Sequence, residues 1–401
     1  MGETLQDHAM RMPMVLHISA DFPDPFDPDK TPVIKSLVEF TCGSIRSEAI
    51  SINRRSPDRS AFVSRVLHHP FRPALPVRTE GFSHGIALEY EAPGKGLFHR
   101  AMLEQLGTAI ADLCREKQLR PDLIIGHKLS IEGIAAAEAA RILGVPYALS
   151  IQGDTDTKVL AARPDLTGMF RRIFHEAAIV FPFAPWALHA VEMRLGQRAG
   201  ATQILPCPTD LDQPLEPIVT GGDFVSVFHL RNHRRKNLRG MADAMRLLKG
   251  SGTAPPLEII GGGAPETLTQ CKKLTGDIPE MRFAGALDRE ALRARLNRAV
   301  AMVLPSLRES FGLVFVEALF AGTPIIYPRG AAIDGFFEGM RFAIAVDARD
   351  PASIAEAISF ARENEHELKA ALARWQRSEH ARSFQRAAIA EAFESAIKRA
   401  I

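Results

Sequence analysis

The stretch Leu304–Gly322, LPSLRESFGLVFVEALFAG, predicts the end of a strand, a loop, a helix over Phe311–Ala321 and a glycine that ends the helix. The helix is apolar on every side except at Glu317, so we expect it to be buried. A buried carboxylate needs a hydrogen-bonding or charged partner. Glu317 therefore either pairs with a protein group, such as a nearby arginine, or receives hydrogen bonds from a ligand, for which sugar hydroxyl groups are suitable donors.

The start of this helix has the features of an anion site. Ser310 is a favoured N-cap residue, although it could serve only to cap the helix. The first turn consists of Phe311, Gly312 and Leu313, whose free N–H groups lie at the positive end of the helix dipole. Gly312 also permits a ligand to approach the backbone closely. Because a carboxylate repels a diphosphate, we expect Glu309 to contact neutral hydroxyl groups beside the phosphate.

On both sides of this stretch, short apolar runs alternate with helical patterns, which is typical of a parallel sheet with crossover helices. The strands predicted in the first half are Met14–Ser19, Leu123–Gly126, Val145–Ile151 and Ile179–Pro182, and the helices are Ile34–Phe40, Glu132–Leu143 and Trp186–Leu195. The strands predicted in the second half are Phe224–Leu230, Leu257–Ile260, Ala301–Pro305 and Pro324–Tyr327, and the helices are Leu238–Leu248, Arg289–Leu296 and Phe311–Ala321. Residues 351–401 are predicted to be helical, with caps at Asp350 and Ser383.

Prolines, aspartates and glycines cluster in Leu205–Asp223, which we interpret as a linker between domains. The fold class predicted is α/β, with two doubly wound Rossmann-like domains that face a central cleft. In such open sheets, ligands bind beyond the carboxyl ends of the strands.

A basic loop, Arg231–Asn237, follows the predicted strand Phe224–Leu230. At this position Arg231 and Lys236 are candidates to clamp a diphosphate, and the alternative is a solvated loop. The three glycines Gly261–Gly263 follow the next strand and either bring the backbone near a nucleotide or form a tight strand–helix turn.

The composition excludes several classes of protein. The chain has 401 residues, of which 46% are hydrophobic, so it can bury two cores and is not disordered. Its 49 basic and 47 acidic residues argue against a dedicated nucleic-acid binder. The four cysteines contain no CxxC pair, which argues against a zinc site or a disulfide framework. With no signal peptide and no long apolar run, we expect a cytoplasmic protein with at most peripheral contact with the inner face of the membrane.

These motifs together resemble the GT-B fold glycosyltransferases and, within them, the retaining glycosyltransferase family 4. The matching residues, in register, are Pro305-Ser306, Glu309, Phe311-Gly312, Glu317-Ala318 and Gly322-Thr323-Pro324, with Arg231 and Lys236, Gly261–Gly263, Phe283–Gly285 and Thr209-Asp210. The resemblance is specific over residues 200–330. It is weaker before residue 200, where Leu123–Gly153 resembles the strand–helix–strand of the family's first domain.

The resemblance implies an acceptor-side domain over 1–207, a nucleotide-sugar domain over 208–375 and a final helix, 376–401, that packs back on the first domain. It implies transfer of a sugar from a nucleotide-sugar to a hydroxyl acceptor with retention, in surface polysaccharide or glycolipid assembly, without a metal or other cofactor. The implied catalytic residues are Arg231, Lys236 and Glu309. The implied donor-binding residues are Ser310, Phe311, Gly312, Leu313, Glu317, Gly261 and Gly263.

The acceptor-side candidates are His127, Gln152 and Asp154, which follow predicted strands of the first domain. Gln152-Gly153 stands where many family members have His-Gly, and Asp29–Thr31 stands where many have a glycine pair. Asp154–Asp156 is also a DxD triplet, which binds a metal ion in the unrelated GT-A glycosyltransferases. A polar loop that caps the following helix is the alternative.

Residues 46–72 are rich in arginine and histidine with interleaved apolar residues. This region either docks on anionic lipid, which suits a lipid-linked acceptor, or is a solvated helix face and loop. Two other functions compete with sugar transfer. One is a sugar-nucleotide epimerase on the same scaffold, and the other is a non-enzymatic, two-lobed protein that binds sugars or nucleotides.

Overall fold

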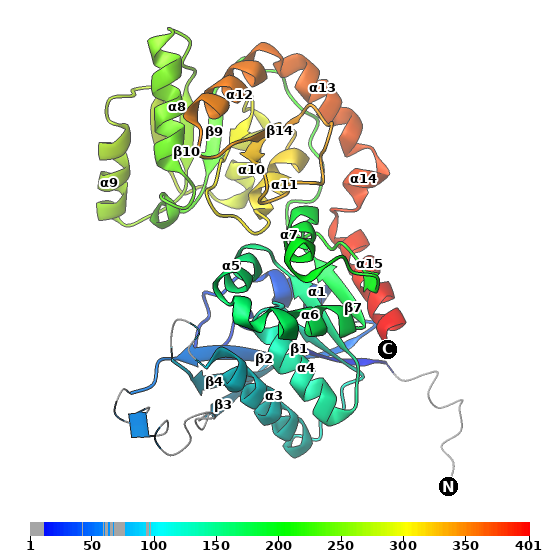
Figure 1. Ribbon diagram of the computed structural model, residues 1–401. Helices are drawn as coiled ribbons and strands as arrows, with labels where there is room; N and C mark the ends of the chain where they lie inside the picture. The colour runs from blue at the N-terminus through cyan, green and yellow to red at the C-terminus, as the bar shows by residue number, and fades with distance from the viewer. Residues whose placement is uncertain are drawn as a thin grey trace. The chain divides into compact units, whose positions relative to one another are not determined.

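The computed structural model describes residues 12–401, except residues 42, 94, 95 and 97 and most of 59–76, where only residues 60, 63, 64 and 67 are described. Contacts divide the chain into two compact units. The first unit comprises the chain through residue 183, residues 187–205 and residues 389–401, and the second comprises residues 184–186 and 206–388. The last helix, α15 (Arg386–Ala400), therefore begins in the second unit and ends in the first (Figure 1).

The described part of the first unit has an eight-stranded sheet with the order β3-β4-β2-β1-β5-β6-β7-β8. The strands are β1 (Met14–Ser19), β2 (Arg46–Arg55), β3 (Val77–Phe82), β4 (Gly85–Glu91), β5 (Leu123–Gly126), β6 (Tyr147–Ile151), β7 (Ile179–Pro182) and β8 (Ala201–Thr202). All neighbouring strands are parallel except β3 and β4, which are antiparallel. The helices are α1 (Val33–Phe40), α3 (His99–Glu116), α4 (Glu132–Leu143), α5 (Asp154–Ala162), α6 (Thr167–Glu176) and α7 (Pro185–Leu195).

The second unit has a six-stranded, fully parallel sheet with the order β11-β10-β9-β12-β13-β14. The strands are β9 (Phe224–Val227), β10 (Leu257–Ile260), β11 (Met281–Gly285), β12 (Met302–Val303), β13 (Ile325–Pro328) and β14 (Ala343–Val346). The helices are α8 (Leu238–Gly250), α9 (Pro265–Thr275), α10 (Arg289–Asn297), α11 (Leu313–Phe320), α12 (Pro351–Glu363), α13 (Glu365–Gln376) and α14 (Glu379–Arg382). In both sheets the first strand of the unit lies inside the sheet rather than at its edge, so the doubly wound α/β prediction is confirmed.

Both predicted helix caps, Asp350 and Ser383, cap a helix in the structure. Asp350 caps α12, because its carboxylate accepts a hydrogen bond from the Ala352 N–H at 2.9 Å. Ser383 does not begin a helix but follows the end of α14, and its hydroxyl donates to the His380 carbonyl at 2.7 Å. Ser383 is thus the C-cap of α14, and the next residue, Phe384, is buried with its ring stacked on Phe337 at 5.4 Å.

Six strands of the described residues were not predicted from the sequence, namely β2, β3, β4, β8, β11 and β14. In β2 only residues 49–52 are buried, and charged residues flank this short run, so the strand signal is weak. Ile50 and Ile52 lie in the core and do not belong to an apolar surface. Val63 and Leu67 are exposed. Arg46, Arg54 and Arg55 are exposed residues of β2. The remaining residues of the basic 46–72 region that suggested membrane docking lie outside the described residues, namely Arg59, Phe62, Arg65, Val66, His68, His69 and Arg72.

Candidate functional site

Lys236 lies at the carboxyl edge of the second sheet, immediately before α8. The next residue, Asn237, adopts a left-handed conformation with φ of 62° and caps α8 by accepting from the Gly240 N–H at 3.1 Å. The Asn237 side chain also donates to the Ala348 carbonyl at 2.6 Å. These two bonds fix the end of the basic loop, so the Lys236 side chain has a defined origin although the loop itself is polar.

The ammonium of Lys236 pairs with the carboxylate of Glu309, and each side chain is only about a tenth exposed, at 11% and 10%. Glu309 Oε2 also accepts from the Ser306 hydroxyl at 3.5 Å. The loop after β12 is joined to the loop after β9 through the Leu307 N–H, which donates to the Arg235 carbonyl at 2.9 Å. Since β9 and β12 are neighbours in the sheet, parallel pairing brings these two catalytic candidates together.

The first turn of α11 begins later than predicted. Leu313 is the first helical residue and Gly312, with φ of 76°, is the N-cap, without a side-chain capping bond. A Cβ added to Gly312 would lie 2.7 Å from the Phe315 ring and 3.1 Å from Glu309 Cγ. The prediction that Ser310 caps this helix was therefore wrong, because the left-handed turn at Gly312 determines where the helix starts. Phe311, predicted in the first turn, is buried before it.

Glu317 is partly buried on α11, and its Oε1 accepts a hydrogen bond from the Thr209 hydroxyl at 2.7 Å. Burial raises the pKa of the Glu317 carboxyl, which the Thr209 bond and the charge of Arg289 oppose. The protein partner of Glu317 is thus Thr209, from the predicted linker. The sequence had suggested an arginine in this role. Arg289 instead forms an ion pair with Asp210, the residue after Thr209.

The remaining candidates of the second unit have different surroundings. Arg231 is exposed, and its backbone N–H donates to the His229 ring at 3.2 Å. A Cβ on Gly261, whose φ is 153°, would lie 1.8 Å from the Phe228 carbonyl oxygen. A Cβ on Gly263 would lie 2.7 Å from the Leu230 side chain. These two glycines are therefore required by the close packing of the turns that follow β9 and β10, which favours the tight-turn interpretation.

In the first unit, His127 is fully buried and belongs to the core. Its Nδ1 hydrogen-bonds with the Ser150 hydroxyl at 3.0 Å, and its Nε2 with His17 Nδ1 at 2.9 Å. The two imidazole rings stack with centroids 5.2 Å apart. Burial lowers the pKa of His127 well below its ordinary value, and burial lowers that of His17 to about 3. Gln152 lies nearby and donates to the His127 carbonyl at 2.7 Å.

The two carboxylates of the DxD triplet contact different groups. Asp154, at the start of α5, pairs with Lys158 at 2.8 Å. Asp156 is fully buried and accepts from the backbone N–H and the hydroxyl of Ser130, at 2.9 and 2.7 Å. Within the described part of the chain, no group of three or more His, Cys, Asp or Glu side chains is arranged to hold a metal ion.

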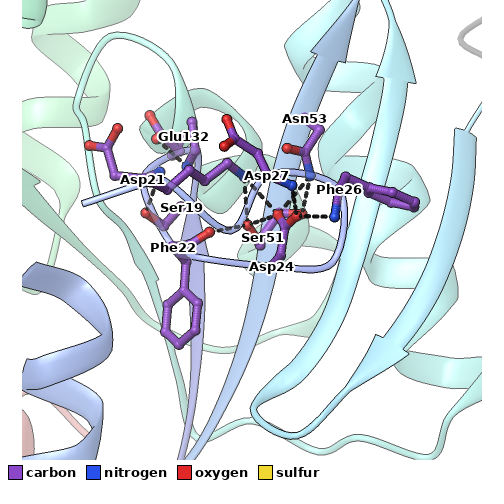
Figure 2. Close-up of polar contacts among 11 residues, drawn as sticks. Ser19, Asp21, Phe22, Asp24, Phe26, Asp27, Ser51, Asn53 and Glu132 are labelled. Carbon is purple, nitrogen blue, oxygen red and sulfur yellow. Dashed lines mark hydrogen bonds and ion pairs between the residues drawn. The ribbon is translucent and has the colours of Figure 1, made fainter. Parts of the chain in front are cut away.

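The loop after β1 is tied to β2 through Asp24. The carboxylate of Asp24 accepts hydrogen bonds from Lys30 at 2.7 Å, from Asn53 at 2.8 Å and from the Ser51 hydroxyl. Figure 2 shows the Ser51 and Asn53 side chains directed toward this carboxylate. The Phe26 N–H also donates to it at 2.8 Å. Lys30, which stands where many family members have a glycine pair, therefore helps to hold the loop in place through its bond to Asp24.

Lys128, which sequence reasoning missed, follows β5 and pairs with Asp21 at 2.6 Å and with Glu132 at 3.5 Å. Burial lowers the pKa of Lys128, but the two carboxylates outweigh it and raise that pKa above its ordinary value. The other contact of Glu132 is the Ala20 N–H, which donates to Oε1 at 2.8 Å. One sequence signal could have indicated this ion pair. Asp21 and Lys128 each lie two residues beyond the end of a strand, β1 and β5, and these two strands are parallel neighbours in the sheet.

Comparison with known proteins shows what the chain is similar to. Residues 217–378 match the family model described as Glycosyl transferases group 1. The chain is 24% identical over 269 residues to TuaC of Bacillus subtilis, described as a teichuronic acid biosynthesis glycosyltransferase, with 64% of this chain and 65% of the relative covered. The chain thus spans slightly less than two thirds of the length of this relative.

Two solved structures are similar over nearly the whole chain. Sucrose-phosphate synthase from Thermosynechococcus elongatus has a TM-score of 0.68 at 18% identity, with 97% of this chain and 98% of that chain covered. The UDP-forming α,α-trehalose-phosphate synthase from Burkholderia xenovorans, in complex with glucose-6-phosphate, has a TM-score of 0.64 at 12% identity, with 96% and 100% covered. The chain therefore has the GT-B fold, and the predicted resemblance to the GT-B glycosyltransferases is confirmed.

Proposed function

We propose that the protein is a glycosyltransferase whose second unit holds a nucleotide-sugar donor. The observation that carries this proposal is the pairing of Lys236 with Glu309 and of Glu317 with Thr209. All of these residues except Thr209 lie within the matched residues 217–378. A cation, two carboxylates and a tight glycine turn suit a ligand that combines phosphate with hydroxyl groups.

The donor diphosphate is held by Lys236 and Arg231. The two negative charges of the diphosphate attract the Lys236 ammonium more strongly than the single carboxylate of Glu309 does. Each charge-assisted hydrogen bond contributes about 1.5–3 kcal/mol. Arg231 has no carboxylate partner among the described residues, so its guanidinium is available for the same diphosphate.

The carboxylates bind the neutral parts of the donor. When Lys236 turns to the diphosphate, Glu309 accepts hydrogen bonds from hydroxyl groups of the transferred sugar. Glu317 keeps Oε1 on Thr209 and accepts from the ribose hydroxyls with Oε2, which that bond does not use. The crowded turn at Gly312 keeps the backbone between these two carboxylates close to the ligand.

The reaction proposed is sugar transfer with retention. The bond between the anomeric carbon and the diphosphate oxygen breaks, the acceptor oxygen bonds to the same face of that carbon, and the acceptor proton passes to the departing phosphate. No side chain acts as a nucleophile. Lys236 and Arg231 stabilise the charge on the leaving group, so catalysis consists of positioning and electrostatic stabilisation.

Several finer points rest on the relatives and remain proposals. The UDP-forming synthase supports a nucleotide donor, and the teichuronic acid relative supports a role in surface polysaccharide assembly. We propose a hydroxyl acceptor, which is carried on lipid if the basic 46–72 region docks on the inner face of the membrane. In the described part of the chain, no helix has the length and apolar character needed to cross a bilayer.

Titration calorimetry with UDP-, GDP- and ADP-sugars tests the proposal. We expect one nucleotide series to bind and Glu317→Ala to weaken binding of the free nucleoside diphosphate as well as of the sugar donor. Adding an acceptor should then release nucleoside diphosphate. Failure of all three series to bind would contradict the proposal, and conversion to an isomeric sugar without release would favour the epimerase.

A further inference from the structure

We infer that a cavity in the first unit binds a phosphate-bearing amphiphile, that is, one molecule with an apolar chain and an anionic head group. The cavity has a volume of about 450 Å³, which is within the range of small-molecule sites. It lies where β2 and β4 end, between the start of α3 and the last turn of α5. The carboxyl ends of strands are the usual ligand-binding edge of an open α/β sheet.

The inner wall of the cavity is mostly apolar. Tyr90, Met102 and Leu103 line it and are 5%, 2% and 3% exposed, so they form its buried part. Ile131 and Val159 also line the cavity and are partly buried. A surface of this kind favours a hydrocarbon chain, because each buried methylene group contributes about 0.8 kcal/mol.

The outer part of the cavity carries positive charge. Arg54 and Lys158 are exposed, Arg163 is partly exposed, and none of the described residues that line the cavity is acidic. The buried wall and the exposed cations together separate an apolar interior from a cationic mouth. This separation matches an amphiphile that inserts its chain and leaves its head group at the surface.

Arg54 is the cation best placed to bind the head group. Arg54 is the second-last residue of β2. Its guanidinium donates a hydrogen bond from Nη1 to the Ala92 carbonyl at 3.0 Å. No carboxylate pairs with Arg54 among the described residues. The planar guanidinium has further N–H donors, and its geometry suits two phosphate oxygens.

The other two cations have exchangeable partners. Lys158 pairs with Asp154 at 2.8 Å and Arg163 pairs with Asp165 at 2.7 Å, and in each pair at least one side chain is well exposed. Such exposed pairs contribute little to stability, so a phosphate can replace their carboxylates. Arg163 also donates to the Gly96 carbonyl at 2.6 Å and so bridges two sides of the cavity.

His99 adds no charge to the cavity. Its Nε2 hydrogen-bonds with the Ser130 carbonyl at 2.7 Å, so Nε2 carries the proton. Burial lowers the pKa of His99, which keeps the ring neutral near pH 7. Among the described lining residues the cationic groups are thus Arg54, Lys158 and Arg163, and the head group is expected at the mouth rather than beside His99.

Binding of decyl phosphate, measured by titration calorimetry below its micelle concentration, tests this site on the full chain. We expect one-to-one binding of decyl phosphate and at least roughly tenfold weaker binding of decanol, decanoate and inorganic phosphate, since each lacks the chain or the dianionic group. Equal binding of decanoate would overturn the assignment of a phosphate head group. Binding only to anionic phospholipid vesicles, and not to the monomer, would overturn the cavity in favour of a membrane surface.

Variants locate the site. Arg54→Gln should weaken decyl phosphate binding about tenfold, and Ala162→Trp, at an exposed lining residue, should abolish it by filling the cavity. Arg55→Gln is the matched control, because Arg55 is the exposed neighbour in β2 and does not line the cavity. Wild-type affinity in Arg54→Gln, or an equal loss in Arg55→Gln, would overturn the site. Lys158→Gln replaces Arg54→Gln if the latter fails to fold.

The nucleotide-sugar assay separates this inference from the proposed function. Arg54 belongs to the first unit, and the proposed donor residues belong to the second. The three cavity variants should therefore bind nucleotide-sugar as the wild type does. Decyl phosphate binding without nucleotide-sugar binding would leave the cavity intact and contradict only the transferase proposal.

Discussion

Lys236 and Glu309 form an ion pair although 73 positions separate them in the chain. Their side chains are about a tenth exposed, so the pair is shielded from most of the solvent. Because β9 and β12 are adjacent and parallel, the loops that follow them meet at one edge of the sheet. The pair thus joins the basic loop to the glutamate motif, and its two charges decide how the site responds to substitution.

Lys236→Ala should abolish nucleotide-sugar binding and also lower stability. The substitution leaves the Glu309 carboxylate without its ammonium partner, and loss of one partner of a largely buried pair costs about 3 kcal/mol. Chemical denaturation measures the loss. The double variant Lys236→Met/Glu309→Gln should recover most of the stability but not the binding. If the double variant were as unstable as the single one, the uncompensated charge would not be the cause.

Gly312→Ala should reduce both stability and donor affinity. An alanine there must adopt a left-handed backbone and also meets the Phe315 ring. Gly339→Ala is the matched control, since Gly339 has a φ of 75° but nothing within 4 Å of an added Cβ. We expect about 1 kcal/mol of loss in the control from the backbone alone. Thermal melting should show a larger loss for Gly312→Ala, and equal losses would refute the crowding argument.

The buried pair His17 and His127 should make the protein less stable in mild acid. The pKa of His17 falls from 6.5 to about 3 on folding, so between these values the unfolded chain binds more protons than the native one. The contribution of the neutral His17 to the free energy of unfolding is therefore fully present above pH 6.5 and decreases as the pH falls toward 3. His17→Gln should flatten this dependence in denaturant titrations at pH 7 and pH 5. The exposed His189→Gln serves as control and should retain the wild-type slope.

Asp24→Asn should loosen the loop after β1. The native carboxylate accepts bonds from Lys30, Ser51 and Asn53, and replacing it leaves the Lys30 ammonium without its anion. We expect about 2–3 kcal/mol of lost stability and faster hydrogen exchange at the Phe26 amide. Asp27→Asn, at an exposed position of the same loop, should change neither quantity. Unchanged exchange in Asp24→Asn would show that the loop is held by other contacts.

The strands and helices that the sequence predicted well are those with strong local signals. The runs at Met14–Ser19 and Leu257–Ile260 are mostly apolar, and both are strands in the structure. The strand β2 was missed because only four of its residues are buried and its ends are charged, a pattern that becomes a strand only through pairing with β1 and β4. Local propensity does not contain those pairings.

The sequence by itself determined the α/β alternation, the GT-B resemblance and the glutamate motif, because these depend on residue types and on spacing within short segments. Only the tertiary structure decided the partners of the charged groups: Glu309 on Lys236, Glu317 on Thr209, and Lys30 on Asp24. It also placed His127 in the core, where spacing alone had suggested an acceptor site. The reason is physical: a side chain's charge state and accessibility depend on neighbours from distant segments, and these neighbours are set by strand order and burial.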